Sequence, residues 1–306
     1  MPRCQTQLLR FHSLSPTDTN QSTLGSLRMA PFIVNDSIVT GYSACYSGRL
    51  ISLHAHVEGE DMVFYKDVDA YHKYAVWIYT PLDSGEFISE VWKLLGRQYH
   101  GVAILFRTNR GRVTTVGPHL LLWRPPTAWT RIFTSANTPT RVYFNDSPAG
   151  IHHLATNQST IHHGFPALPN PLSPYPKRGS IGNYFYTLAL LENVVEIVLC
   201  QREFSTHSQI TGLLIRYSNG NQASVGEFRL DRAGTTLRVD GSRELCLGFA
   251  RTEFKHPYLA KAELFPPADR ASYEWLDLPW TGRLEWWFSF RLCKINHAGR
   301  GSPSLV

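Results

Sequence analysis

The feature that most constrains this 306-residue chain is a run of alternating side chains that ends in a glycine turn. Residues 102–117 read VAILFRTNRGRVTTVG, which places Val102, Ile104 and Phe106 on one face and Leu105 and Arg107 on the other. A period of two is typical of a β-strand. The Asn-Arg-Gly sequence that follows suits a tight turn in which glycine takes a positive φ. The segment therefore predicts a β-hairpin.

The same pattern returns 109 residues later in the chain. Residues 184–226 align with residues 75–117 without a gap, and seven of the 43 positions are identical. The turn glycines and the apolar alternation also coincide, with Ser-Asn-Gly in the second turn. We therefore predict a duplicated β-unit in which Phe106 and Ile215 occupy corresponding places.

The rest of the sequence predicts an all-β fold of two related antiparallel domains, prism-like or sandwich-like, with few short helices. Short β-branched or aromatic runs alternate with turn residues, and only residues 88–95 and 258–264 have a spacing that predicts helix. Five prolines between 166 and 176 predict a linker, because proline lacks a backbone donor. The expected parts are a flexible N-terminal tail at 1–30, a first β domain at 31–164, a proline-rich linker at 165–180, a second β domain at 181–290 and a C-terminal tail at 291–306.

Charge, hydropathy and cysteine usage narrow the classes of function. The net charge is +6, but residues 1–30 carry +2 and residues 291–306 carry +3, so the body of the chain is nearly neutral. A nucleic-acid surface needs clustered Lys and Arg, so we do not expect nucleic-acid binding. A membrane helix needs an apolar run of about 18 residues, which the sequence lacks, so we do not expect a membrane span either. Five scattered cysteines and a start without a secretory apolar core indicate an intracellular, cytoplasmic protein.

The first hairpin and the strand before it resemble a known family. Residues 85–119 contain GEFISEVWKLL and GVAILFRTNRGRVTTVGPH, an order that resembles the jacalin-like lectins. The resemblance implies a β-prism that binds a glycan or another polyhydroxylated small molecule through loops at one end. A purely structural role for these turns is the alternative. The candidate ligand-binding residues are Asn109, Arg110 and Gly111 in the first turn and Asn219 and Gly220 in the second.

A second hypothesis concerns a divalent metal. His54 and His56 share one face of an expected strand and Glu60 follows, and two imidazoles with a carboxylate suit Fe, Mn, Ni or Zn. The order Gly-x5-His-x-His-x3-Glu resembles the first metal motif of cupins. This reading predicts a metal-assisted isomerase, cyclase or dehydratase with a β-barrel pocket, whereas two ordinary histidines on a solvated strand are the alternative. A fourth ligand could come from His100 or His119.

Other recurrent or clustered residues are read as structural. Arg107 and Arg216 recur at equivalent hairpin positions, where an arginine stem can cover a sheet face. Trp286 and Trp287 lie in the run GRLEWWFSF, which favours a core strand over a sugar-stacking surface. The motifs of the common cofactor enzymes are absent from the sequence. We therefore expect a non-catalytic binding module without a cofactor, and a protein partner is a further alternative.

Overall fold

The computed structural model separates the chain into two compact units, each described by itself below. Unit 1 comprises residues 1–60 and 85–169, and unit 2 comprises residues 61–84 and 170–306. The predicted all-β class is confirmed. The residues that the structure describes are 9–14, 28–95, 102–119, 129–145, 147, 149–157, 162–164, 166, 168, 170–174, 176, 184–268 and 270–303.

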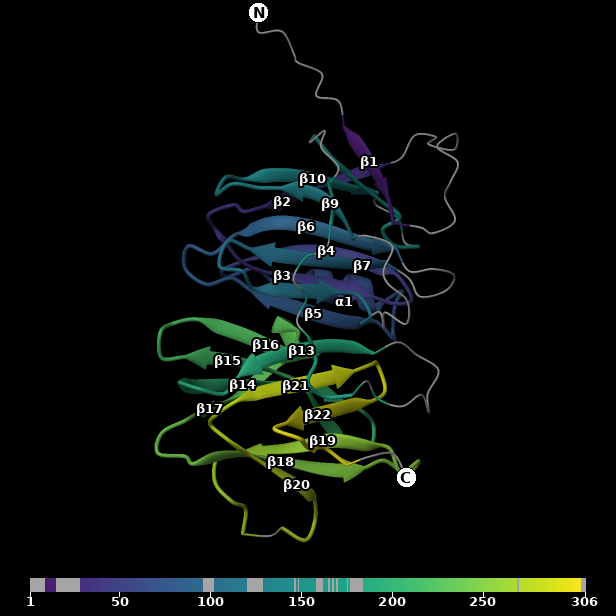
Figure 1. The fold of residues 1–306 in the computed structure, drawn as a ribbon. Coiled ribbons are helices and arrows are strands. Elements are labelled where there is room, and N and C mark those ends of the chain that lie inside the picture. The colour runs from purple at the N-terminus through teal and green to yellow at the C-terminus, as the bar shows by residue number, and fades with distance from the viewer. Residues whose placement is uncertain are drawn as a thin grey trace, which may run out of the picture. The chain divides into compact units, whose positions relative to one another are not determined.

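Unit 1 is built from antiparallel strands. One of its hairpins joins β3 (Val39–Tyr46) to β4 (Leu50–Val57). One sheet contains, in spatial order, β1 (Arg10–Ser13), β11 (His153–Thr156), β10 (Thr140–Asn145) and β2 (Met29–Val34). A second sheet contains β12 (His162–Gly164), β9 (Trp129–Thr134), β6 (Ile88–Leu95), β7 (Val102–Thr108) and β8 (Val113–Val116). Figure 1 shows these strands in purple to teal.

Unit 2 includes helix α1 (Val63–Asp69), strand β5 (Val76–Pro81) and the short 3₁₀ helix Leu230–Arg232. One sheet contains β13 (Phe185–Leu190), β21 (Arg283–Phe288), β22 (Cys293–His297) and β23 (Arg300–Gly301). A second contains β16 (Gln222–Gly226), β15 (Ser208–Tyr217), β14 (Val194–Glu203) and β17 (Ala233–Arg238). A third contains β19 (Pro257–Glu263), β18 (Glu244–Arg251) and β20 (Glu274–Pro279), drawn in green to yellow in Figure 1.

The two hairpins on which the predicted duplication depends have the same strand register. Phe106 pairs with Thr114 in the β7–β8 hairpin, and Ile215 pairs with Ala223 in the β15–β16 hairpin. Each residue of the second pair therefore lies 109 positions after its counterpart in the first pair. Both Phe106 and Ile215 are buried. The turns agree as well, because their glycines at 111 and 220 have φ values of 79° and 82°.

Two predicted helices are wrong. Residues 88–95 form β6, which lies between β7 and β9, and most of residues 258–264 form β19 at the edge of its sheet. Strand β6 pairs with β7 and β9, and β19 pairs with β18, so pairing in a sheet overrides the local spacing. Helix α1 was not predicted, and within the described residues no sheet closes into the barrel expected for the enzyme hypothesis.

Parts of the expected tails and linker lie in ordered structure. Strand β1 lies within the predicted N-terminal tail and pairs with β11, and β22 lies within the predicted C-terminal tail and pairs with β21. In the proline-rich segment, the amides of Leu172 and Ser173 each donate a hydrogen bond of 2.8 Å to the carboxylate of Glu285. Burial alone would raise the pKa of Glu285, but these hydrogen bonds outweigh it and the pKa is lowered. Glu285 therefore fastens this segment to β21.

The tryptophans of β21 belong to the core, as predicted. Trp286 and Trp287 are buried, and the Trp287 indole donates to the Ser173 hydroxyl at 2.9 Å. Four of the five cysteines are described, and all four are buried free thiols. The described part of the chain holds no helix with the length and apolar character that crossing a membrane requires.

Candidate metal centre

Strand β4 brings two histidines to one face of unit 1. His54 and His56 are two residues apart, so their side chains point to the same side of the strand. Across the β3–β4 hairpin, Ser43 pairs with His54 and Gly41 pairs with His56. Glycine brings no side chain to this face, and the two imidazole rings lie with their centroids 4.9 Å apart.

A turn after β4 returns Glu60 to the two imidazoles. The strand ends at Val57, and Gly59 in the following turn has a φ of 77°. A Cβ atom at Gly59 would meet nothing within 4 Å, so the backbone angle rather than space favours glycine there. The Glu60 carboxylate then lies 2.8 Å from His54 Nε2 through one oxygen and contacts His56 Nδ1 through the other.

The resulting cluster is partly enclosed. The His56 side chain is fully buried, whereas 14% of the Glu60 side chain and 28% of the His54 side chain are exposed. The three prospective ligand atoms lie within 4.8 Å of one another. The ring of His56 is held from behind by Ser43, whose Oγ lies 2.7 Å from Nε2. The opening to solvent is therefore on the His54 side.

The donor set fits a divalent transition ion. Neutral imidazoles and a carboxylate are ligands for Zn²⁺, Mn²⁺, Fe²⁺ and Ni²⁺, and histidine ligands usually carry a hydrogen-bond partner on the second ring nitrogen. Ser43 supplies that partner for His56. His119 is not part of the cluster, and burial lowers its pKa. His100, the other residue considered as a fourth ligand, lies outside the described residues.

The residues predicted to bind a sugar contribute to the hairpin turns. The Asn109 side chain accepts a hydrogen bond from the amide of Phe87 at 2.9 Å and donates one to the carbonyl of Gly85 at 3.2 Å. Asn219 Oδ1 accepts a hydrogen bond from the amide of Asn221 at 3.0 Å. Arg110 is exposed. Asn109, Arg110 and Gly111 belong to unit 1, whereas Asn219 and Gly220 belong to unit 2.

Arg107 and Arg216, which recur in the two hairpins, each form an ion pair with a glutamate. Arg107 forms an ion pair with Glu90 at 3.3 Å, and Arg216 forms one with Glu196. Each glutamate lies on the neighbouring strand of the same sheet. Nearly half of each arginine side chain is exposed, so these ion pairs are surface contacts between strands, in line with the structural interpretation.

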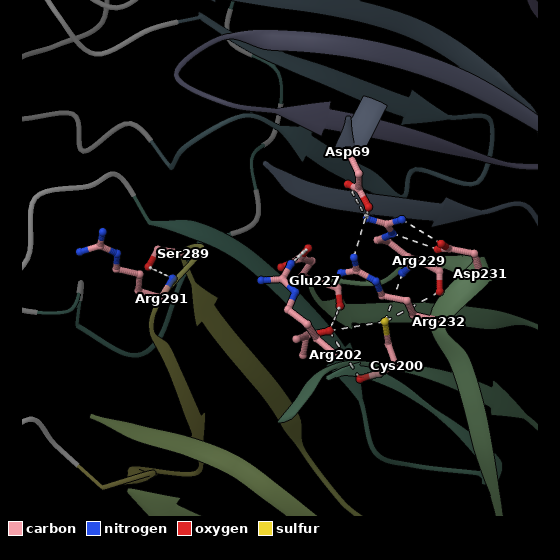
Figure 2. A network of polar contacts seen from close by, with 10 residues as sticks. Asp69, Cys200, Arg202, Glu227, Arg229, Asp231, Arg232, Ser289 and Arg291 are labelled. Atoms are coloured by element: carbon pink, nitrogen blue, oxygen red, sulfur yellow. Dashed lines mark hydrogen bonds and ion pairs between the residues drawn. The ribbon is translucent and has the colours of Figure 1, made fainter. Parts of the chain in front are cut away.

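Sequence reasoning missed a buried charge network in unit 2, which Figure 2 shows. Arg229 donates to both oxygens of Asp69 at 2.9 and 2.8 Å and to both oxygens of Asp231 at 2.9 and 2.8 Å. Its guanidinium also lies over the rings of Tyr65 and Trp77. Burial alone would lower the pKa of Arg229, but the two carboxylates outweigh it and the pKa is raised. The network anchors α1, because Asp69 ends that helix.

The Cys200 thiol next to this network is not poised for nucleophilic catalysis. Arg202 forms an ion pair with Glu227, and both side chains are nearly buried. Burial raises the pKa of Glu227, and it raises the pKa of the Cys200 thiol to about 11. A thiol with that pKa stays protonated near neutral pH and is a poor nucleophile. We therefore treat the network in Figure 2 as structural.

A second group of metal-ligand side chains lies in unit 2, where Cys246 lies close to Glu244 and Asp277. Burial, followed by the two carboxylates, raises the pKa of the Cys246 thiol to about 12. Arg270 already donates to both oxygens of Asp277 at 2.8 Å. The Cys246 thiol therefore stays protonated and the Asp277 carboxylate is already paired with Arg270. This group is a poorer candidate metal site than the histidine centre.

Comparison of the sequence with protein-family models and with curated proteins finds no match.

Proposed function

We propose that this protein is a metal-dependent binding module, in which unit 1 holds one divalent transition ion and the ion takes a polyhydroxylated small molecule as ligand. The observation that carries the metal part is the convergence of His54, His56 and Glu60, whose prospective ligand atoms lie within 4.8 Å of one another. His54 Nε2, His56 Nδ1 and a Glu60 oxygen are the atoms that would hold the ion.

The number of protein ligands supports a role beyond structure. Structural zinc sites are closed by four protein ligands, whereas three ligands leave a position for water or another oxygen donor. The partial exposure of His54 places solvent access on that side of the centre. Hydroxyl oxygens of a sugar or another polyol are donors of the kind that enters such a position. The ligand class itself comes from the resemblance of residues 85–119 to jacalin-like lectins.

The same three-ligand centre supports a second candidate function. Catalytic metal sites keep one position for water or substrate, so a metal-assisted isomerase, cyclase or dehydratase fits the same residues. Binding is preferred because both oxygens of the Glu60 carboxylate already contact the imidazoles, which engages Glu60 as a ligand rather than as an acid or base. The enzyme hypothesis needs a further acid or base.

The first experiment measures metal stoichiometry and affinity. The full chain is equilibrated with Zn²⁺, Mn²⁺, Co²⁺ or Ni²⁺ and analysed by elemental mass spectrometry after dialysis. We expect an ion at the histidine centre, and we expect His54→Ala and Glu60→Gln to lower its affinity at least 100-fold, beyond the roughly 10–100-fold effect of losing an outer partner. Glu58→Gln is the matched control, because Glu58 is exposed in the same turn. Equal affinities for Glu58→Gln and Glu60→Gln would refute the site.

The second experiment tests the ligand. A glycan array is probed with the metal-loaded protein and with the protein after chelation. Binding that disappears on chelation and in Glu60→Gln supports the proposal. Binding that persists under both conditions contradicts the role of the metal. A blank array with a stoichiometric ion contradicts the ligand class and favours the enzyme.

A further inference from the structure

We infer that Ser43 is a positioning residue of the metal centre, because its hydroxyl can reverse its hydrogen bond with His56 when an ion replaces the proton on Nδ1. The inference rests on the proposed function. It concerns a residue of β3 that the order of histidines and glutamate in the sequence does not point to.

The geometry places the two His56 nitrogens in different surroundings. Nδ1 contacts a Glu60 oxygen, and Nε2 lies 2.7 Å from Ser43 Oγ. Ser43 and His56 are both fully buried. A neutral imidazole has one N–H donor and one acceptor nitrogen, so the group facing each nitrogen decides where its proton lies.

The metal-free centre calls for one arrangement of protons. A carboxylate only accepts hydrogen bonds, so Nδ1 facing Glu60 carries the proton and donates it. Nε2 is then the acceptor, and the Ser43 hydroxyl donates to it. In this state the serine acts as a hydrogen-bond donor.

A bound ion calls for the opposite arrangement. The ion needs the lone pair of Nδ1, so the ring proton must lie on Nε2. The proton leaves Nδ1 and an equivalent proton binds Nε2 through solvent, and the charge of the neutral ring does not change. The Ser43 hydroxyl then rotates and accepts from Nε2–H. A hydroxyl can serve both states because it has one donor and two acceptor lone pairs.

The consequence is a residue that supports metal binding without touching the ion. In Ser43→Ala the buried Nε2–H loses this acceptor in the loaded state, and loss of an outer partner typically lowers metal affinity about 10–100-fold. Ser43→Cys keeps the size but offers a weak donor and acceptor, so it should also bind less tightly. Thr40→Ala is the matched control, because Thr40 Oγ1 lies 3.4 Å from the main-chain oxygen of His56 rather than from its ring.

The test combines Zn²⁺ titration with NMR of ¹⁵N-labelled histidine, with the His56 signals assigned from a His56→Gln variant. By NMR we expect the His56 proton on Nδ1 in the metal-free protein and on Nε2 in the Zn²⁺-loaded protein. By titration we expect Ser43→Ala to lower the Zn²⁺ affinity about 10–100-fold and Ser43→Cys to lower it as well. Thr40→Ala should change the affinity less than about 3-fold. The Cys variant decides if the Ala variant does not fold.

The outcomes separate the two proposals. A wild-type protein that binds no Zn²⁺ overturns the proposed function and this inference together. A wild-type protein that binds Zn²⁺ leaves the proposed function standing, and the inference alone fails if both Ser43 variants bind as tightly as the wild type. It also fails if His56 carries its proton on the same nitrogen in both states.

Discussion

Removal of Arg229 should destabilise unit 2 far more than removal of an exposed arginine. The Arg229 side chain is 2% exposed and makes four hydrogen bonds to Asp69 and Asp231. Breaking a buried ion pair by deleting one partner costs about 3–5 kcal/mol. The carboxylates of Asp69 and Asp231 are 35% and 21% exposed and would recover water, so we expect the lower end of that range for Arg229→Ala.

The expected loss is measurable. Unit 2 spans roughly 160 residues, for which each kcal/mol corresponds to about 2–4 °C in Tm. A loss of about 3 kcal/mol should therefore lower the Tm of unit 2 by about 6–12 °C. Urea unfolding followed by fluorescence gives the free energy of unfolding, and hydrogen exchange of peptides from β14 and β15 assigns the transition to unit 2.

A double-mutant cycle isolates the contribution of the pair. Arg229→Ala and Asp69→Ala, made singly and together, should show a coupling energy of about 2 kcal/mol, the value typical of hydrogen bonds to charged groups. The control cycle uses Arg216 and Glu196, where the arginine side chain is 47% exposed, and should give about 0.2–1 kcal/mol. A coupling for Arg229 and Asp69 no larger than that of the control would refute the argument from burial.

Two further predictions concern unit 1 and the second hairpin. Burial, with Lys93 and Arg10 adding to it, lowers the pKa of His12 to about 4. As the pH falls, the unfolded chain therefore protonates His12 before the folded protein does. The free energy of unfolding of unit 1 should fall by up to about 3 kcal/mol between about pH 6.5 and pH 4. Urea unfolding of His12→Leu should lack that pH dependence. Gly226→Ala should lower the free energy of unfolding by at least about 3 kcal/mol. Its Cβ would lie 2.4 Å from the Thr211 carbonyl oxygen, and the backbone φ at this position is 75°. A Cβ at Gly220 would lie in open space, so Gly220→Ala should cost only about 1 kcal/mol. Equal losses in the two glycine variants would contradict this reasoning.

The candidate metal centre was accessible from sequence because its parts are local. His54 and His56 lie two residues apart on a strand, and Glu60 follows after a single turn. Ser43 was not accessible in the same way, because it reaches His56 only through the register of β3 with β4. Register depends on bulges, and this hairpin has irregular pairing at both ends.

The same contrast explains the errors in local structure. Residues 88–95 have a spacing that suits a helix, but as β6 they lie between two strands of a five-stranded sheet. Helix α1 is only seven residues long, and an isolated helix of that length is unstable in water. Its last residue, Asp69, pairs with Arg229, which lies 160 positions away in the chain. No local pattern around either residue predicts that contact.

The amino-acid sequence by itself determined the all-β class, the two matching hairpins and the proximity of His54, His56 and Glu60, because alternation, turn glycines and spacing act over a few residues. The tertiary structure alone decided that residues 61–84 join unit 2, that Arg229 pairs with Asp69 and that Ser43 contacts His56. These contacts depend on which distant strands pair and in what register, and that choice is made by the burial of the whole chain rather than by any short segment.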